Sequence, residues 1–276
     1  MTRRSTEPRR SGILAAAAAA TAAVVGVATW AAAKVLRKMD PKIEQKTMFG
    51  RAFVFNVEDE AGEPVRVLAV GGAVQSGSYL GERRFEAPFE YYRAFDHMFE
   101  ASIPVRRVLM IGGGAYAWPK HALTTRDDLR LDVAEIDPAI TEIARRHFFL
   151  DELEQRAGER LRIFSADGRS VVDAGGEPYD AIANDSFAGD VPTGSLLTDE
   201  GIVAIKSRLV EGGLYLVNVV CGLDLSRLQA TVELLKARFA HVYVIPCTDP
   251  DFSDDDNYLV IATDGDHAFS NAIEAD

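Results

Sequence analysis

The feature that most constrains the fold is a regular alternation of short apolar runs and amphipathic segments after residue 105. Four successive apolar runs end in glycine or an acidic residue, at 108–117, 133–138, 165–168 and 179–185. Alternation of this kind predicts βαβ units with right-handed crossovers and a mostly parallel sheet. Ligands of such sheets bind just beyond the carboxyl ends of the strands. The pattern therefore predicts a small-molecule site at one edge of a sheet.

Apolar periodicity and turn residues define the individual elements of this region. The predicted strands cover 107–111, 129–136, 161–165, 179–184, 214–220, 241–246 and 258–263, and the predicted helices cover 118–124, 139–149, 199–209 and 225–239. The first four strands are mostly apolar, which is typical of parallel strands covered on both faces. We place one α/β domain over residues 104–264, followed by a polar tail over 265–276 that we expect to fray.

The preceding segment, residues 41–103, has a different pattern. Two runs rich in β-branched and aromatic residues, at 51–57 and 65–70, flank a stretch with the composition of a turn. This arrangement predicts an antiparallel hairpin. Residues 85–102 are aromatic and amphipathic, which predicts a helix that the following proline ends. The segment is thus expected to be a small β-hairpin domain plus one helix.

Residues 1–40 form a third part. Residues 12–33 carry no charge, consist mostly of alanine and are long enough to span a bilayer. We prefer a hydrophobic helix that anchors the chain in a membrane. A cleaved export signal is the second interpretation, because Arg9-Arg10 is a twin arginine and residues 31–33 are small. A soluble alanine-rich helix is the third.

The composition restricts the partners. The net charge is −12 and the pI is near 4.9, and an acidic chain repels phosphate backbones, so we expect no nucleic-acid partner. The same charge suits a cationic substrate such as a polyamine, and it also serves solubility. The only cysteines, Cys221 and Cys247, lack metal-binding spacing, so no metal site is predicted. Two semi-buried thiols are favoured over a disulfide.

The first two strand ends carry a glycine turn and an acid. Gly112-Gly-Gly114 follows a strand and opens a helix, which suits either a tight turn or a close approach of the backbone to a ligand. Glu135 ends the next strand, where a carboxylate is placed to accept hydrogen bonds from ribose hydroxyls. Asp137 precedes a proline and is predicted to cap the following helix.

The next two strand ends complete the pattern. A carboxylate at Asp167 can accept from the amine of an adenine, and Gly168 leaves room for the ring, although a plain turn also explains the pair. Asp185 ends the fourth strand, where it can take a proton from an attacking amine, or else start a loop as an Asx-turn. Acids and glycines at successive strand ends favour one nucleoside site. The pair Gln75-Ser76, after the hairpin, is a candidate lid contact to the nucleoside.

These residues, in this order, resemble the spermidine/spermine synthase family, over about residues 45–263 and most closely its membrane-associated branch. The aromatic pair Tyr91-Tyr92, the 197–200 segment and the 206–213 segment contribute to the likeness. The resemblance implies a Rossmann-like class I methyltransferase fold with a seven-stranded, mostly parallel sheet behind a small β domain. It implies aminopropyl transfer from decarboxylated S-adenosylmethionine to a diamine, and a possible homodimer.

The resemblance also implies residue roles. It gives nucleoside contacts to Gln75, Gly112, Gly114, Glu135, Asp167 and Gly168, and a catalytic role to Asp185. The family pattern is not complete: Ala115 and Ala188 stand where the family has aspartates, and Tyr91-Tyr92-Arg93 stands where it has Tyr-His-Glu. A buried ammonium without a counter-charge is unfavourable by several kcal/mol. The adenosine half of the site is therefore expected to be intact and the polyamine half degenerate.

Three functions follow from these observations. The first is a spermidine-synthase-like transferase that uses decarboxylated or ordinary S-adenosylmethionine as co-substrate and no metal. The second is a small-molecule methyltransferase, which Ala115 favours because ordinary S-adenosylmethionine carries a carboxylate near that place. The third is a non-catalytic nucleoside-binding or scaffold protein. Because the cofactor is intracellular, we expect an anchored chain to hold its catalytic domain in the cytoplasm; export by a twin-arginine signal is the alternative.

Overall fold

The computed structural model describes residues 43–59, 61–188, 191–192, 195–221, 224–247 and 256–275. The hydrophobic segment at 12–33 lies outside these residues, so its predicted membrane helix stays a prediction. Within the described part of the chain, every helix is too short or too polar to cross a bilayer. Residues 42–276 form one compact unit, and the description below concerns this unit.

The predicted hairpin is part of a four-stranded antiparallel sheet. Its strands pair in chain order and are β1 (Ile43–Thr47), β2 (Gly50–Glu58), β3 (Pro64–Val70) and β4 (Ala73–Tyr79). The predicted turn joins β2 to β3, where the Asp59 carboxylate accepts from the backbone N–H groups of Ala61 and Glu63. A carboxylate that bonds the backbone just ahead of it stabilises such a turn.

The helix predicted over 85–102 is shorter than expected. A short 3-10 helix, η1 (Gly81–Arg83), is followed by α2 (Glu90–Ala94), which tightens into the 3-10 helix η2 (Phe95–Glu100). Pro88 explains the late start, because the residue before a proline avoids helical backbone angles. Phe89 is still extended, with φ −94° and ψ 144°, and the helix begins directly after it.

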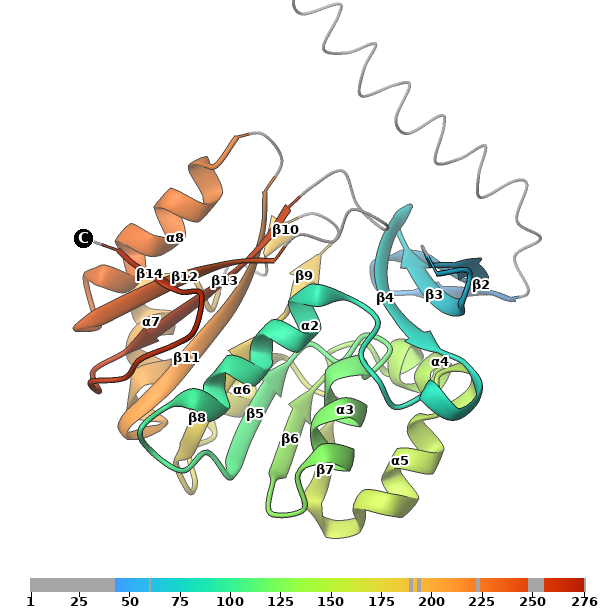
Figure 1. The fold of residues 1–276 in the computed structure, drawn as a ribbon, viewed down its shortest axis with the longest axis horizontal. Coiled ribbons are helices and arrows are strands. Elements are labelled where there is room, and N and C mark those ends of the chain that lie inside the picture. The colour runs from blue at the N-terminus through green and yellow to red at the C-terminus, as the bar shows by residue number, and fades with distance from the viewer. Residues whose placement is uncertain are drawn as a thin grey trace, which may run out of the picture. The chain divides into compact units, whose positions relative to one another are not determined.

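The α/β domain contains one mixed sheet of eight strands in the order β14-β12-β13-β11-β8-β5-β6-β7 (Figure 1). The strands are β5 (Arg107–Ile111), β6 (Arg130–Ala134), β7 (Leu161–Phe164), β8 (Tyr179–Asn184), β11 (Leu209–Cys221), β12 (His241–Cys247), β13 (Asp256–Thr263) and β14 (Ile273–Glu274). Five neighbouring strands of the sheet are parallel to one another: β11, β8, β5, β6 and β7. Strand β13 is antiparallel to both of its neighbours, β11 and β12. A mostly parallel α/β sheet is thus confirmed.

Helices cover both faces of this sheet. They are α3 (Ala117–Thr125), α4 (Pro138–His147), α5 (Leu150–Ala157), the 3-10 helix η3 (Gly158–Arg160), α6 (Gly168–Asp173), α7 (Asp199–Ser207) and α8 (Ser226–Lys236). The small ribbon β9 (Phe187–Ala188) and β10 (Val191–Pro192) follows β8. The sequence analysis missed α5 and α6. Phe149, the last residue of the predicted helix 139–149, separates α4 from α5 in a left-handed conformation, with φ 62°, although it is not the glycine or asparagine that usually marks such a boundary.

The polar tail does not fray. The side chain of His267 is buried, its Nδ1 accepts from the backbone N–H of Ser102, and its Nε2 lies 2.8 Å from the carbonyl oxygen of Gly212. Ser270 donates from its backbone N–H to Glu100, and β14 pairs with β12. These contacts add an eighth strand where seven were predicted. Short polar segments of this kind are held by specific hydrogen bonds that apolar periodicity does not reveal.

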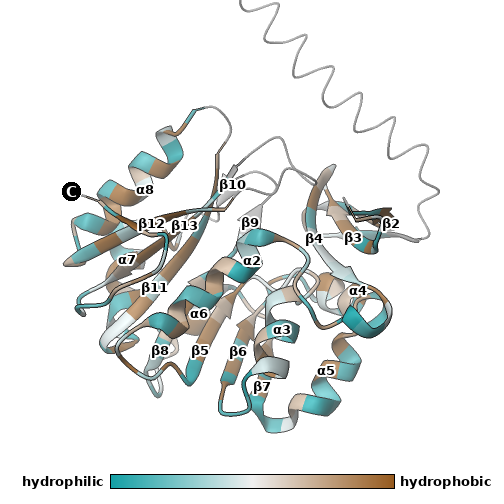
Figure 2. Cartoon of the chain, viewed as in Figure 1, coloured by the Kyte–Doolittle hydropathy of each residue, from teal (hydrophilic) through white to brown (hydrophobic). Residues whose placement is uncertain are grey.

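The core follows from the alternation of side chains along the strands. Tyr215, Val217 and Val219 are buried against Ile202 of α7 and Leu235 of α8. Figure 2 shows the apolar strands inside helices whose outer surfaces are polar. The intervening residue, Asn218, must therefore point to the opposite face of the sheet.

The two cysteines end β11 and β12 and are both buried. Strand β13 lies between them, where Cys221 pairs with Asp256 and Cys247 pairs with Asn257. Two strand spacings correspond to roughly 10 Å, which is too far for a disulfide. The predicted pair of thiols is the arrangement that this geometry permits.

A buried lysine on α3 joins the small sheet to the α/β domain. Lys120 of α3 is fully buried, and its ammonium donates to the Ser78 hydroxyl of β4 at 2.7 Å and to the Phe148 carbonyl at 2.8 Å. Its nitrogen also lies 5.7 Å from the centre of the Phe149 ring. Burial lowers the pKa of Lys120 to about 7, and Glu152 opposes this change. The Lys120 ammonium is thus held mainly by two neutral acceptors, a hydroxyl and a backbone carbonyl.

The buried lysine should make stability depend on pH. Because the folded pKa lies below the ordinary value of 10.5, the unfolded chain binds more protons between pH 7 and 10.5, and the free energy of unfolding should rise with pH in this window. From pH 7 to 9 the rise should be about 2 kcal/mol in urea denaturation. Lys120→Met should lack this increment, whereas Lys206→Met, at a half-exposed lysine, should keep it. Equal slopes in all three proteins would contradict the assignment.

Close packing at the start of α6 gives a second prediction. A Cβ atom at Gly168 would lie 2.2 Å from Cγ2 of Ile111. Gly168→Ala should therefore lower the free energy of unfolding by about 1–3 kcal/mol, because overpacking forces a shift of the backbone or the side chain. Removing the obstructing methyl by Ile111→Ala should relieve this penalty, so the two substitutions should not be additive in denaturation experiments. Strict additivity would show that the contact is not the cause.

Candidate active site

The carboxyl ends of β5, β6, β8 and β11 meet at one edge of the large sheet because these strands are parallel. The strand β4 and the helix α2 lie close to this edge, as the arrangement in Figure 1 shows. Backbone hydrogen bonds join the strand ends to one another: the N–H of Gly112 donates to Ala134 at 2.9 Å, and the N–H of Asp185 donates to Ile111 at 2.8 Å. Three strand ends are thus locked together.

The glycine turn is packed against protein atoms. Gly112 has φ 95°, and a Cβ atom there would lie 2.3 Å from the carbonyl oxygen of Asp185. At Gly114, φ is 52° and a Cβ atom would lie 3.3 Å from the Ser76 side chain. The positions require glycine because of left-handed angles and neighbouring strands. The turn therefore explains these two glycines without a ligand, and their predicted nucleoside contacts stay predictions.

A tyrosine follows the turn in an unusual conformation. Tyr116 is fully buried at φ 54°, ψ 36°, a left-handed conformation that is rare for bulky residues. Its ring fills the space beside Gly113, where a Cβ atom would lie 2.8 Å from the ring, and its hydroxyl lies 3.0 Å from that of Thr141. A strained residue next to a candidate site marks a turn that the surrounding packing fixes.

Glu135 binds the glycine turn rather than pointing into solvent. It is 6% exposed, and its Oε2 accepts from the N–H groups of Gly113 at 2.8 Å and Gly114 at 3.3 Å. Its Oε1 accepts from the N–H of Asp137 at 2.9 Å. Burial raises the pKa of Glu135, and these three N–H groups oppose that rise.

This arrangement limits what Glu135 can do for a ribose. An ionised carboxylate offers about four lone pairs, and three of them are already used. One position, on Oε1, remains for a hydroxyl. A second hydroxyl requires the 3.3 Å bond to Gly114 to open. The carboxylate is therefore placed to hold one ribose hydroxyl directly and to exchange its weakest backbone bond for another.

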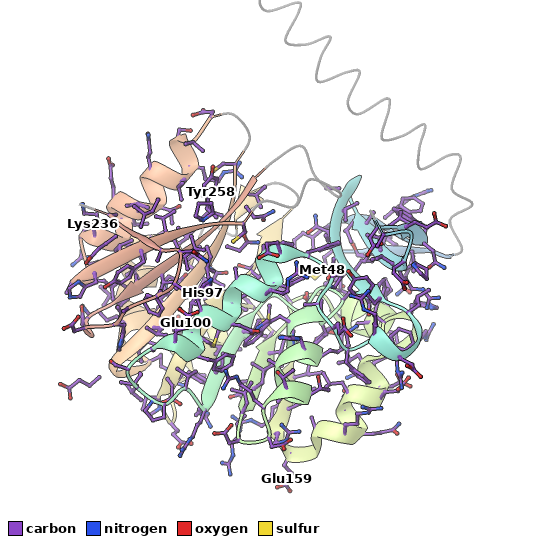
Figure 3. The ribbon with its side chains drawn as sticks, in the orientation of Figure 1. Met48, His97, Glu100, Glu159, Lys236 and Tyr258 are labelled. Carbon is purple, nitrogen blue, oxygen red and sulfur yellow. The ribbon has the colours of Figure 1, made fainter. Side chains whose placement is uncertain are left out.

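Asp137 caps α4, as the sequence predicts. Its Oδ1 accepts from the backbone N–H of Ala139 at 2.9 Å. Its Oδ2 accepts from the backbone N–H of Met48, in the turn between β1 and β2, at 2.5 Å; Met48 is labelled in Figure 3. The small sheet is thereby tied to the loop that carries Glu135.

Asp167 and Gly168 have structural roles at the start of α6. The Asp167 carboxylate accepts from the backbone N–H of Ser170 at 3.1 Å and so caps the helix. Gly168 permits contact with Ile111, and this methyl, rather than an open space for an adenine ring, occupies the side of Gly168 where a Cβ atom would project. The contact with Ile111 by itself requires glycine here, and the expectation that Gly168 leaves room for an adenine ring stays a prediction. Asp167 is only partly buried, and its contact with an adenine amine also stays a prediction.

Asp185 is a carboxyl group with a raised pKa. It lies partly buried beyond the end of β8, and its Oδ1 accepts from the amide of Asn218 at 2.8 Å. Burial raises the pKa of Asp185 to about 7, and the Asn218 N–H opposes the rise. A group with this pKa is about half ionised at neutral pH, as a general base requires.

A hydroxyl pair lies next to Asp185. The Tyr92 hydroxyl of α2 is 2.6 Å from the Ser76 hydroxyl of β4, and Ser76 also accepts from the backbone N–H of Ala115 at 3.0 Å. Burial, followed by the Asp185 charge, raises the pKa of Tyr92. Tyr92 is therefore a neutral donor at physiological pH. The backbone carbonyl of Gln75 accepts weakly from the hydroxyls of Tyr91 and Tyr92, so Gln75 joins the site through its backbone.

Two residues of this site, Tyr116 and Asn218, escaped the sequence analysis as site residues. Nothing in the local pattern marks a tyrosine after a glycine turn or an asparagine in a strand as functional. The histidines near the motifs pair with acidic side chains. His97 pairs with Glu100 (Figure 3), and His121 pairs with Asp96. Over the described ranges, no cluster of potential metal ligands occurs.

Residues 88–264, more than half of the chain, match the spermine/spermidine synthase domain. A polyamine aminopropyltransferase of Vibrio vulnificus (strain CMCP6) is 26% identical over 182 residues, which cover 63% of this chain and 58% of the relative. The eEF1A lysine and N-terminal methyltransferase of Mus musculus is 28% identical over 147 residues, which cover 50% of this chain and 20% of the relative. The chain thus spans just over half of the length of the first relative.

Two solved structures share the fold. A probable spermidine synthase from Corynebacterium glutamicum ATCC 13032 matches with a TM-score of 0.67 and 22% identity, over 83% of this chain and 82% of that chain. A spermidine synthase in complex with the transition state analogue AdoDATO has a TM-score of 0.67 and 21% identity, over 82% of this chain and 75% of that chain. With its glycine turn and acidic strand ends on this fold, and with the match over residues 88–264, the chain belongs to the spermine/spermidine synthase family.

Proposed function

We propose that this protein is a transferase that binds S-adenosylmethionine or its decarboxylated form and transfers an aminopropyl or another alkyl group to an amine. The observation that carries the proposal is the position of Asp185, whose backbone lies directly against the glycine turn and whose carboxyl has a pKa of about 7. A general base at the reacting centre beside a nucleoside-type turn serves transfer from a sulfonium donor. Family membership supports the same chemistry.

In this proposal the described residues divide into a donor half and an acceptor half. Glu135 holds a ribose hydroxyl, and Asp167 and the 112–114 turn border the nucleoside. Asp185 accepts the proton that the amine loses as it attacks, and Tyr92 remains a neutral hydrogen-bond donor beside it. A sulfonium carbon is already electrophilic, so positioning of the nucleophile supplies much of the remaining catalysis.

We propose further that the acceptor half is not a typical polyamine site. Ala115 is fully buried, and its N–H binds Ser76, so no carboxylate stands at this place. Arg93 is paired with Glu90, which adds no free negative charge there. The side chain of Ala188, and all of Asp190, lie outside the described residues. The departures favour an acceptor with a single amine near Asp185.

A methyltransferase is the second candidate. The missing acid at Ala115 favours a donor that keeps its carboxylate, and the likeness to a methyltransferase of Mus musculus supports the same choice.

We also propose that residues 12–33 anchor the chain in a membrane with this domain in the cytoplasm. The uncharged composition of that segment and the intracellular origin of the donor support this location.

Calorimetric titration tests the donor half. Methylthioadenosine and S-adenosylhomocysteine should both bind to the full chain, and Glu135→Gln should weaken binding roughly 10- to 100-fold, because it loses a charge-assisted bond to a hydroxyl and faces N–H groups with an amide. Asp137→Asn is the matched control, since its carboxylate caps a helix in the same loop. No binding of either ligand to the wild type would leave the scaffold hypothesis. Tighter binding of S-adenosylhomocysteine, the ligand that keeps the carboxylate, would favour methyl transfer.

The catalytic base gives a pH prediction. Only the ionised form of Asp185 accepts a proton, so kcat/KM expressed per neutral amine should rise with pH, about tenfold per unit below pH 7, and level off above it. Asp185→Asn should lower the rate by about 10²–10⁴-fold. Asp180→Asn, at the other end of the same strand where the carboxylate binds backbone N–H groups, should keep the pH profile. Unchanged turnover in Asp185→Asn would remove the assignment.

A further inference from the structure

Asn218 is a buried amide that uses only one of its four hydrogen-bonding positions. It is 4% exposed and lies in the middle of the site edge, on β11. Its Nδ2 donates to Asp185 at 2.8 Å. Its Oδ1 is one of three buried side-chain N or O atoms that find no partner among the described residues, and the other two are guanidinium nitrogens. A buried carbonyl oxygen without a partner is unfavourable by about 1–3 kcal/mol, so a ligand that satisfies it gains this energy.

The strand register places this amide beside the base. Val217 pairs with Asn184, so the next residues, Asn218 and Asp185, lie side by side at the end of two parallel strands. An ionised carboxylate only accepts, which requires the amide N–H of Asn218 to face Asp185 and its carbonyl oxygen to face away. Asp185 and Asn218 together therefore offer two hydrogen-bond acceptors at neighbouring positions.

We propose that Asn218 is a specificity-determining residue that receives one N–H of the attacking amine while Asp185 receives the other. The inference rests on the proposed function and extends it to the number of N–H groups that the nucleophile must carry. A neutral primary amine has two N–H groups and one lone pair, which matches two acceptors and the donor carbon. A secondary amine leaves one of the acceptors unsatisfied, and a hydroxyl or thiol does so as well.

The chemical step balances with these groups. The nitrogen lone pair forms the C–N bond as the C–S bond breaks, and the electron pair of that bond neutralises the sulfonium. The nitrogen becomes positively charged, and one of its protons passes to the Asp185 carboxylate. Asn218 keeps its bond to the second N–H throughout, and its amide N–H stabilises Asp185 before transfer.

The test compares a primary amine with its N-methyl analogue. Butylamine and N-methylbutylamine are titrated calorimetrically into the full chain saturated with methylthioadenosine, at a pH near the ordinary amine pKa of about 10 so that neutral amine is present. The same pair is used as acceptors in transfer assays. The wild type should favour butylamine by about tenfold or more, which corresponds to one hydrogen bond to a buried acceptor. Asn218→Leu should reduce the preference to less than threefold. Asn218→Ser serves the same comparison if the leucine variant does not fold.

A second readout separates this role from a structural one. Removal of the Asn218 N–H should raise the pKa of Asp185. This pKa is measured from the pH profile of kcat/KM or by NMR titration. Thr231→Val, which removes a buried hydroxyl on α8, should alter stability without changing the amine preference. An unchanged preference in the Asn218 variants, or no preference in the wild type, would overturn the inference. Absence of transfer by a wild type that still shows the binding preference would refute only the proposed function.

Discussion

The structure at the site depends on one constraint: the β5 strand end must approach the β8 strand end so closely that only glycine fits at position 112. The space for its Cβ is taken by the Asp185 backbone, 2.3 Å away. This contact fixes Asp185 beside the turn, and Glu135 then secures the turn by accepting from Gly113 and Gly114. Backbone amides that would otherwise be buried without partners are satisfied in this way. The same contacts that stabilise the fold therefore place the two carboxyl groups for which we propose functional roles, and the glycines need no ligand to explain them.

The two carboxyl groups differ because their surroundings differ. Glu135 accepts from three backbone N–H groups, which oppose the effect of burial on its pKa. Asp185 has one amide donor and a neighbouring tyrosine, and its pKa is raised to about 7. A group that is held by many donors binds, whereas a group with few donors exchanges its proton near neutral pH. Environment thus distinguishes two acids at the ends of β6 and β8, the strands on either side of β5, a pattern typical of active sites.

The sequence predicted the large-scale fold because apolar runs and glycine or acidic ends are local patterns. The strand 179–184 and the cap at Asp137 agree with the structure. The sequence did not predict the helix α5 after Phe149, the strand β14 or the burial of His267; β14 and His267 depend on contacts with residues distant in the chain. The contact of Gly168 with Ile111 was not predicted, because a sequence does not show which atom lies opposite a missing Cβ. In the candidate site, the acids were predicted from their positions at strand ends, whereas Asn218 becomes visible only through its partner.

The side chains around Asp185 are where we propose that the amine binds. A diamine site needs negative charge, but the described residues beside Asp185 are hydroxyls and an amide: Ser76, Tyr92 and Asn218. Such neutral groups recognise the number and direction of N–H groups rather than the charge of a substrate. The ion pair between Arg93 and Glu90 at the end of α2 is consistent with this change, because it removes a carboxylate that could otherwise hold an ammonium. In the proposed mechanism, recognition by neutral groups also accounts for a carboxyl with a pKa near 7. Because the described side chain that binds Asp185 is a neutral amide, we expect the amine to enter in its neutral form and Asp185 to take the proton only after the new bond has begun to form.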